Sequence, residues 1–544
     1  MNKNLLLLII CMSTVFGGLI HPPDGSKLSY VHVLFEWEEI PGSTGYDFQL
    51  SVSNDFSDPL ISANTADLYY IEKDAINWES NYYWRVRSEN DDWMNPNQFS
   101  TGETSVTFQN DDKPIEILEY NPALASDGIT IYGTYHKNYS AAIDMHGNEV
   151  WNSGGDTSHV FFGLDANNNF LGGQYNSQYP NSLIGCEFSI NNDIIWSESV
   201  NEEIQNGEIF TQHEIIKLPN GNHMGFVPVI EKHPIPTYTN YPERITSFSW
   251  ESDCYIFMSS DYKWKGEKIV EWDNEGEIVW EWNVFDHYSI DDFDYLAGEQ
   301  EGHWENICSA GGFTSYDWIH FNALVYDEVE NAIYVSSRHL SRITKIDYNS
   351  KQIVWNMGLQ WFGDDVISFN DFISGQHGLQ LLSNGNIVTL DNGIHSQIYI
   401  SGLTAPISRA LEINISEENG QYAATTVWSH SLSYDLYGFS SGNVQKLNSG
   451  NYLINTIGNV DGAYSIEITQ NHETAWMCKY NLGTYNNGPL YRAMRKAGLY
   501  ETDSPSLSIQ NFNLPQSFQL KSIYPNPFNP IINIEYELSE PTAV

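Results

Sequence analysis

The feature that most constrains this chain is a turn-and-strand unit that recurs six times between residues 144 and 476. Each copy has a turn bearing Gly, Asn or acidic residues, followed by a short strand that ends in tryptophan. The six tryptophans are Trp151, Trp196, Trp280, Trp355, Trp428 and Trp476. One such unit cannot bury its apolar face alone, but a ring of them can. The pattern predicts an all-β fold organised as a six-bladed β-propeller over residues 111–501.

A second repeated hairpin supports the same fold. A leucine is followed by a turn ending in Gly-Asn at 218–222, 382–386 and 447–451, with a weaker copy at 164–168. Asn-Gly turns are typical of tight antiparallel hairpins. The intervals from Trp196 to Trp280 and from Trp355 to Trp428 leave room for insertions. Because insertions in a propeller extend from one face, we expect them to help build a site.

A small β-sandwich is predicted ahead of the propeller, over residues 20–110. Apolar and polar residues alternate at 31–37, 46–52 and 82–87, and turn residues separate these runs. Trp37 and the strand Tyr82-Tyr83-Trp84-Arg85-Val86 resemble bacterial fibronectin type III domains. The resemblance implies a spacer or adhesion module, and we assign no chemistry to it.

The N-terminus is typical of an exported protein. Residues 1–18 combine one lysine, a short apolar run and small residues, as in a secretory signal peptide. The apolar run is too short to cross a membrane, and no later segment is long and apolar enough to do so. Ile10 stands before Cys11 where a lipoprotein signal requires a small residue, which argues against lipidation.

The C-terminal segment carries a second export feature. Residues 502–515 are polar and are predicted to be a linker. Residues 516–544 contain Tyr524-Pro-Asn-Pro-Phe-Asn-Pro530 and then an alternating strand. They resemble the start of a type IX secretion sorting domain, which we expect to be truncated here. The resemblance implies the type IX machinery as a partner and a secreted or cell-surface location after passage through the periplasm. The alternative is a proline-rich tail.

Charge limits the partners that the chain can bind. It has 24 Lys and Arg against 70 Asp and Glu, a formal net charge of −46. Such a chain repels nucleic acid and anionic membrane surfaces, so neither is an expected partner. An anionic substrate requires a local cluster of Arg and His. The four cysteines beyond the signal have no CxxC spacing, so no zinc site is suggested. They form either one disulfide of undetermined pairing or buried free thiols.

Three histidines occupy the same place in the repeat. Gln212-His213 and Gln376-His377 each precede an apolar strand and an Asn-Gly turn, and His320 likewise precedes a strand. In a ring of blades, equivalent positions converge on the central channel. Clustered ionisable groups in a channel are typical of functional sites, although a single histidine in such a place is usually structural. Arg338 ends the next strand and is a candidate anion clamp, because cations are scarce in this chain.

These residues resemble the arylsulfate sulfotransferases. The resemblance lies in Asp317-Trp-Ile-His-Phe-Asn322, Ser336-Ser-Arg-His339, the Gln-His segments and Asp391-Asn-Gly393, and it covers most of residues 133–499. It implies a six-bladed propeller that transfers sulfuryl groups between phenols by a ping-pong mechanism. The donor would be a phenolic sulfate and the acceptor a phenol, with no metal or organic cofactor.

The resemblance also implies roles for individual residues. His377 would be the nucleophile that becomes sulfated, while His213, His320 and Arg338 would bind the sulfuryl oxygens. His320 or His213 would serve as acid and base toward the phenols. Asn322 would belong to the substrate-binding residues and would orient a neighbour. Trp318 or Trp361 would stack on the aryl ring, unless both only pack in the core.

Two other classes of function are alternatives to a sulfotransferase. A catalytically silent surface propeller that binds glycans or proteins would not need all four of His213, His320, Arg338 and His377. A quinone-dependent dehydrogenase would also repeat tryptophan, but it needs acidic calcium ligands and usually eight blades, and this sequence suggests neither.

Overall fold

The computed structural model describes most of the chain in separate stretches. They are residues 18–89, 91–105, 114–135, 139–154, 159–165, 169–175, 183–199, 211–234, 262–292, 316–361, 363–394, 405–459, 462–481, 490–500, 518–524 and 533–538. The predicted signal peptide (apart from Gly18), the linker at 502–515, and Cys254 and Cys308 lie outside these stretches. Cys186 and Cys478 are buried free thiols.

The chain divides into two compact units, residues 1–502 and 503–544. In the second unit, β36 (Phe518–Tyr524) and β37 (Asn533–Leu538) pair as an antiparallel hairpin. Its likeness to a sorting domain stays a prediction, as does export of the chain. No helix among the described residues is both long and apolar enough for a membrane span.

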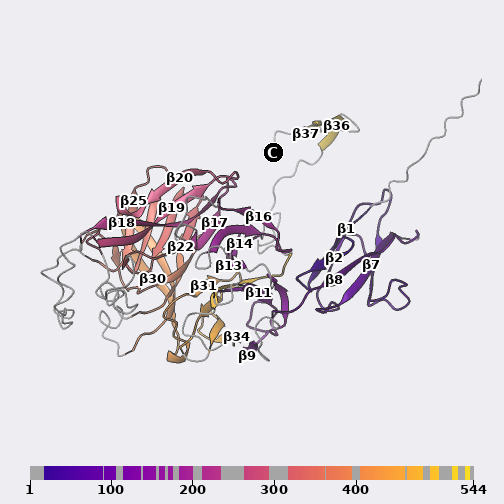
Figure 1. Ribbon diagram of the computed structural model, residues 1–544, viewed down its shortest axis with the longest axis horizontal. Helices are drawn as coiled ribbons and strands as arrows, with labels where there is room; N and C mark the ends of the chain where they lie inside the picture. Colours follow the sequence, from indigo (N-terminus) through magenta and orange to yellow (C-terminus); the bar gives the residue numbers. More distant parts are fainter. Residues whose placement is uncertain are drawn as a thin grey trace, which may run out of the picture. The chain divides into compact units, whose positions relative to one another are not determined.

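The first unit begins with two facing sheets, drawn in indigo in Figure 1. One sheet consists of β1 (Leu19–His21), β3 (Val33–Trp37) and β6 (Tyr69–Glu72). The other consists, in spatial order, of β2 (Ser26–Leu28), β8 (Asn97–Thr101), β7 (Asn81–Ser88), β4 (Tyr46–Ser51) and β5 (Ile61–Thr65). In β7 every second residue from Tyr82 to Ser88 is buried, as the alternation in the sequence predicted. The region is a β-sandwich, and its fibronectin type III character stays a prediction.

Six further sheets follow in the described residues from 115 to 496, and we number them blades 1 to 6. Blade 1 has β35 (Leu490–Lys496), β10 (Ile129–Thr134), β11 (Tyr139–Ile143) and β12 (Glu149–Asn152). Blade 2 has β13 (His159–Leu164), β14 (Phe170–Tyr175), β15 (Leu183–Phe188) and β16 (Ile194–Ser197). Blade 3 has β17 (Gln212–Lys217), β18 (His223–His233), β19 (Tyr262–Trp272) and β20 (Ile278–Asn283), with β21 (Tyr316–Asp317) pairing β19.

The remaining blades have the same order from the inside outward. Blade 4 has β22 (Phe321–Asp327), β23 (Ala332–Ser337), β24 (Arg342–Asp347) and β25 (Ile353–Gly358). Blade 5 has β27 (His377–Leu381), β28 (Ile387–Asp391), β29 (Arg409–Glu418) and β30 (Gln421–Ser431), with β26 (Ser368–Phe369) beside β30. Blade 6 has β31 (Asn443–Lys446), β32 (Tyr452–Thr456), β33 (Ala463–Ile468) and β34 (Thr474–Tyr480), with β9 (Ile115–Tyr120) beside β34. Among the described residues, two single 3₁₀ turns, η2 (Val284–Asp286) and η3 (Tyr434–Leu436), lie between strands.

The blades form a ring, which makes the fold an all-β propeller. A separate cluster of buried apolar side chains lies between each pair of consecutive blades, including blade 6 and blade 1. The ring is closed twice, because β35 from the chain's end pairs with β10, and β9 from before blade 1 pairs with β34. The number of sheets equals the number of tryptophan turns. Because several intervening segments lie outside the described residues, the blade count of the whole chain stays a prediction.

The repeated tryptophans join neighbouring blades. Each lies on the fourth strand of its blade counted from the inside, and in five of the six the indole N–H donates to a main-chain carbonyl in a turn of the next blade. Such bonds run from Trp151 to Ile190, Trp196 to Asp273, Trp280 to Tyr348, Trp428 to Gln470 and Trp476 to Met145, over 2.8–3.3 Å. The last of these crosses from blade 6 to blade 1. The sequence repeat is therefore an inter-blade hydrogen bond repeated around the ring.

In four blades, an asparagine at the turn between the two innermost strands is hydrogen-bonded to a buried glutamate of the same blade. Asn386 Nδ2 donates to Glu412 over 2.6 Å, and Asn451 Nδ2 donates to Glu467 over 2.7 Å. Asn222 and Asn169 make the equivalent bonds to Glu271 and Glu187, both over 2.7 Å. The last case comes from the weaker copy of the turn. A buried carboxylate needs such partners to remain in the interior.

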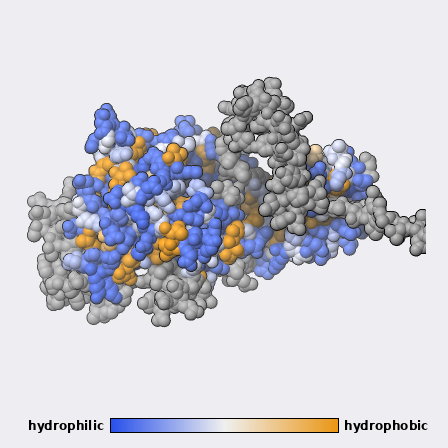
Figure 2. Space-filling model, turned by 90° about the horizontal axis from the view of Figure 1, so that it is seen from above, coloured by the Kyte–Doolittle hydropathy of each residue, from blue (hydrophilic) through white to orange (hydrophobic). Residues whose placement is uncertain are grey.

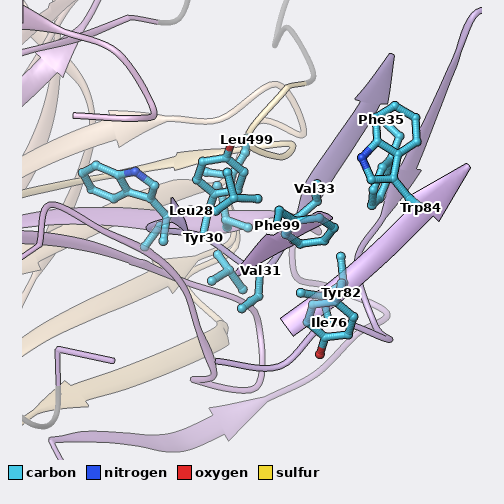
Figure 3. Close-up of a cluster of buried hydrophobic side chains, with 14 of the residues drawn as sticks. Leu28, Tyr30, Val31, Val33, Phe35, Ile76, Tyr82, Trp84, Phe99 and Leu499 are labelled. Atoms are coloured by element: carbon cyan, nitrogen blue, oxygen red, sulfur yellow. The ribbon is translucent and has the colours of Figure 1, made fainter. Parts of the chain in front are cut away.

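The sandwich packs against blades 1 and 2 through one continuous apolar cluster. Leu499, from just beyond β35, lies beside Tyr30 and Leu28 of the sandwich (Figure 3). The Tyr30 hydroxyl also donates to Asn191 Oδ1 over 2.9 Å, and Trp78 Nε1 donates to the Glu149 carbonyl over 2.9 Å. On the face seen in Figure 2 the surface is mostly hydrophilic, with small separate apolar groups.

Replacing Trp476 with Phe removes the indole hydrogen bond that joins blade 6 to blade 1. The Met145 carbonyl then loses its donor in a site where Trp476 is fully buried. We expect the free energy of unfolding to fall by about 1–3 kcal/mol, as measured by urea denaturation. Trp428→Phe is the control, because its indole bond is more exposed and 3.2 Å long, and it should cost less. An unchanged unfolding midpoint for Trp476→Phe would show that this hydrogen bond does not stabilise the closed ring.

Candidate functional site

The three predicted histidines lie at the start of the innermost strands of three consecutive blades. His213 is in β17, His320 immediately precedes β22, and His377 begins β27. The ring centroids of His213 lie 4.6 Å from those of His320 and 6.4 Å from those of His377. The structure therefore brings together the residues that the repeat placed in equivalent positions.

The local backbone explains why these side chains leave the sheet. A bulge interrupts each of the three strands, between Gln212 and Ile215, Phe321 and Ala323, and His377 and Leu379. His213 and His320 adopt the left-handed conformation, with φ of 64° and 54°. In the third copy, glycine takes that conformation beside the histidine, at Gly378 with φ of 73°. Such bulges turn side chains and carbonyls toward the channel.

A cavity of about 530 Å³ lies over the histidines. His213, His320, Arg338 and His377 all line it. The remaining walls are largely aromatic and apolar, with some hydroxyl groups. They consist of Tyr135, Ile394, Pro406, Tyr437, Phe439, Ser440, Ser441 and Tyr491. The cavity thus joins a polar, nitrogen-rich floor to aromatic walls, and its size suits a small organic ligand.

His377 is held in one tautomer. Its Nδ1 lies 2.6 Å from the main-chain carbonyl of Gly442, which can only accept a hydrogen bond. The proton is therefore on Nδ1, and Nε2 carries a lone pair. Burial, reinforced by the positive charge of Arg492, holds the pKa of His377 well below its usual range. The ring is neutral at pH 7 and presents an unprotonated nitrogen.

His320 forms a pair with Asp317. Its Nδ1 donates to Asp317 Oδ2 over 2.7 Å. Burial lowers the pKa of His320, and the Asp317 charge opposes that effect. Although burial acts to raise it, the pKa of Asp317 lies well below its ordinary value because His320 and Lys265 lie nearby. Glu267 is buried in the same region, and burial together with the Asp317 charge raises its pKa to about 8.

His213 is anchored by a residue from the last strand of the ring. The Tyr491 hydroxyl donates to the His213 carbonyl over 2.6 Å and lies 3.3 Å from His213 Nδ1. Burial and the neighbouring His320 and His377 hold the pKa of His213 well below its usual range. This imidazole is also neutral at pH 7.

Arg338 is fixed on two sides and lines the cavity between them. Its Nη1 donates to His339 Nε2 over 3.0 Å, and its Nη2 donates to the Phe439 carbonyl over 3.0 Å. His339 Nδ1 donates in turn to the Asp317 carbonyl over 2.7 Å. A guanidinium held in this way can stabilise negative charge on a bound group.

A second arginine, Arg492, crosses the channel beneath the histidines. Its Nη1 donates to Glu214 Oε2 over 2.5 Å, and its Nη2 donates to the Asn322 carbonyl. It also lies 3.4 Å from the Phe162 carbonyl. Phe162 and Asn322 are bulge residues whose carbonyls are free of the sheet ladder. Arg492 therefore satisfies groups that the bulges expose, and it links the inner strands of four blades.

The structure places Asn322 and Trp318, the two predicted substrate-binding residues, in the interior. Neither is among the described residues that line the cavity, and both are fully buried. Asn322 Nδ2 donates to the carbonyl of Gln376, next to His377, over 2.7 Å, so it braces a neighbour. Trp318 packs in the core between blades 3 and 4 and donates to the Asp292 carbonyl over 2.5 Å. Trp318 therefore has its alternative predicted role, which was packing in the core. We no longer assign substrate binding to either residue.

One group of side chains could in principle hold a metal ion. Donor atoms of Asp317, His320 and His339 lie within 4.8 Å of one another. Both ring nitrogens of His339 are already hydrogen-bonded, one of them to the Arg338 guanidinium. A cation bound there would displace that bond and lie next to a positive charge. The donor set does not fit a metal well, and we assign none.

Sequence reasoning missed several parts of the site. Asp317 lies three residues before His320 in the segment 317–322, and that spacing could have suggested a hydrogen-bonded Asp–His pair. Tyr491 and Arg492 belong to no repeat, because they come from the closing strand. The carbonyl of Gly442 has no sequence signal, since every residue has one. Of the wider intervals, the one from Trp355 to Trp428 supplies Ile394 and Pro406 to the cavity.

Replacing Asp317 with Asn removes the carboxylate that favours protonated His320. The pKa of His320 should therefore fall below its wild-type value, because burial then acts without that opposing charge. Histidine NMR titration, with the signal assigned by loss in His320→Gln, measures the change. The NMR signal of the exposed His472 serves as the internal control. An unchanged or higher pKa for His320 would show that the pair is unimportant.

Searches against known proteins gave one family match and several structural likenesses. No curated protein matches the chain significantly. A Bacteroides caccae protein of unknown function is 11% identical, with a TM-score of 0.38, over 68% of this chain and 98% of its own. The periplasmic gluconolactonase of Pseudomonas aeruginosa is 9% identical, with a TM-score of 0.32, over 83% of this chain and 99% of its own.

The family match falls on the part of the propeller that holds most of the site. Residues 252–492 match the family model described as Arylsulfotransferase (ASST). The matched part contains His320, Arg338 and His377 and ends at Arg492, whereas His213 precedes it. The match supports a sulfotransferase function in general. Residues 252–492 of this all-β propeller chain are thus similar to the arylsulfotransferase family.

Proposed function

We propose that the chain is an arylsulfate sulfotransferase that works through a sulfated His377. The observation that carries this proposal is the tautomer of His377, whose Nε2 is unprotonated beside Arg338 and two further histidines in one cavity. A neutral imidazole nitrogen is a good nucleophile near pH 7. The aromatic walls suit a phenolic ring, and the family match supports sulfuryl transfer.

In the first half of the proposed reaction, His377 Nε2 attacks the sulfur of an aryl sulfate. The S–N bond forms as the S–O bond to the ring breaks, and the leaving phenolate takes a proton from His320. Arg338 and His213 stabilise the negative charge on the sulfuryl oxygens. The Asp317 carboxylate supports His320 in its protonated form, which makes His320 rather than His213 our choice for the acid.

The second half reverses these steps with an acceptor phenol. The phenol gives its proton to His320 as its oxygen attacks the sulfur, and the S–N bond breaks to regenerate neutral His377. His320 acts as acid in one half and base in the other, which returns the site to its starting state. Each half-reaction balances without a metal or an organic cofactor.

The local charge supports binding of a monoanion in an acidic protein. Arg338 lines the cavity, and Arg492 lies below it. His377 and His213 are neutral and add no positive charge, so they offer a nucleophile and hydrogen bonds instead. Because the chain has a net charge of −46, the arginines at the cavity contrast with the negative potential expected of the chain as a whole.

Replacing His377 with Ala should abolish sulfuryl transfer from 4-nitrophenyl sulfate to phenol. The measurement is acceptor-dependent release of nitrophenol, with His472→Ala as a surface control that keeps wild-type activity. Mass spectrometry of quenched wild-type enzyme should find one added sulfuryl group on the peptide carrying His377. Folded protein with no turnover on several aryl sulfates would favour the alternative, a binding propeller without catalysis.

Replacing Arg338 with Lys keeps the charge but loses the two-armed attachment to His339 and Phe439. We expect kcat to fall by about 10²–10³-fold, the usual effect of losing one stabilising donor of transition-state charge. Steady-state kinetics measures it. Arg85→Lys in the sandwich is a matched control that should leave kcat unchanged. Wild-type kcat in Arg338→Lys would remove Arg338 from the mechanism.

A further inference from the structure

One loop carries main-chain carbonyls to both of the key cavity residues. We call residues 437–442, between η3 and β31, the 437–442 loop. The carbonyl of Gly442 accepts from His377 Nδ1 over 2.6 Å, and the carbonyl of Phe439 accepts from Arg338 Nη2 over 3.0 Å. Any displacement of this loop would therefore alter the nucleophile and the anion clamp together.

The loop follows a path that its backbone alone would not favour. Ser441 and Gly442 both adopt left-handed conformations, with φ of 54° and 84°. A Cβ atom added at Gly442 would lie 2.3 Å from the Asn455 carbonyl, so only glycine fits there. A serine in this conformation costs energy, which means that neighbouring groups must hold the loop in place.

Asn392 is the side chain best placed to do so. It is fully buried just after β28, in the same blade as His377. Its Nδ2 donates to the carbonyls of Gly438 over 2.7 Å and Ser441 over 3.1 Å, which lie near the two ends of the loop. Ser408 supports the same attachment, since its Oγ accepts from the Gly438 N–H over 3.0 Å and donates to the Asn392 carbonyl over 2.8 Å.

We propose that Asn392 is a positioning residue for the His377 nucleophile. By holding the 437–442 loop, Asn392 keeps the Gly442 carbonyl on His377 Nδ1 and so leaves Nε2 free to attack sulfur. Without that carbonyl, neutral His377 would exchange between its two tautomers, and one of them has a proton on Nε2 and cannot attack. Arg338 would lose its attachment to Phe439 in the same event. This proposal rests on the proposed sulfuryl transfer through His377.

The kinetic test uses the first half-reaction alone. Wild-type enzyme mixed with excess 4-nitrophenyl sulfate and no acceptor should release a burst of nitrophenol. Asn392→Ala should lower the burst rate constant by about 10–100-fold, which is typical when a residue that orients a functional group is lost. The half-saturating concentration of 4-nitrophenyl sulfate should stay similar to that of the wild type. Ser408→Ala should lower it in the same direction but less.

Asn451→Ala is the matched control. Asn451 is also a buried asparagine whose Nδ2 makes two hydrogen bonds, to the Leu124 carbonyl and to Glu467, but it lies in the turn between β31 and β32 and contacts neither His377 nor the 437–442 loop through these bonds. Its loss should lower the unfolding midpoint without lowering the burst rate constant of the folded protein. If Asn392→Ala lowered the burst rate constant no more than Asn451→Ala does, the proposal would be wrong.

A second readout does not depend on turnover. In protein labelled with ¹⁵N-histidine, His377 should give one protonated and one unprotonated ring nitrogen in a single tautomer, assigned by loss in His377→Gln. Asn392→Ala should convert this to an averaged pattern, and Asn451→Ala should not. An unchanged His377 tautomer in Asn392→Ala would overturn the proposal. A wild type with no burst but the expected tautomer change would instead refute the sulfuryl-transfer function and leave Asn392 as the residue that orients His377.

Discussion

The pairing of β35 with β10 is the constraint on which the rest of this structure depends. It brings the end of the propeller chain against its beginning, and it makes the last strand the innermost strand of blade 1. The Trp476 indole bond to the Met145 carbonyl secures the outer side of the same seam. Only a closed ring buries both faces of every blade, so closure determines whether the apolar cluster between blades 6 and 1 forms.

Closure also completes the site, because β35 delivers two residues into the channel. Tyr491 attaches to His213 on blade 3, and its carbonyl accepts from the Gly442 N–H over 2.8 Å. Arg492 pairs with Glu214 and caps the carbonyl of Asn322. A buried charge pair contributes little net stability on average, but breaking one is costly because an unpaired charge remains. Loss of ring closure would therefore disrupt both the fold and the candidate site.

The bulges at the start of the inner strands connect this architecture to chemistry. A regular strand would direct all its carbonyls into the sheet, and alternate side chains into the cores between blades. The bulges at His213, Asn322 and Gly378 release carbonyls and turn side chains toward the axis. The released groups must then find partners, and Arg492, Tyr491 and Thr389 supply them. The result is a set of imidazoles held in place in one cavity with aromatic walls.

The sequence by itself determined the parts that depend on local pattern. Six tryptophan turns and repeated Asn-Gly hairpins predicted an all-β propeller, and three histidines in equivalent positions predicted a shared site, because repeat symmetry converts equal sequence positions into neighbouring places around an axis. Tertiary structure alone decided what depends on closure and on main-chain direction. Tyr491, Arg492 and the Gly442 carbonyl are distant in sequence from the histidines that they hold, and Trp318 and Asn322 belong to the core although they flank His320. Residues two apart on a regular strand share a face, but the left-handed backbone at His320 and the bulge at Asn322 break that alternation, so proximity in sequence could not decide which of them reaches the cavity.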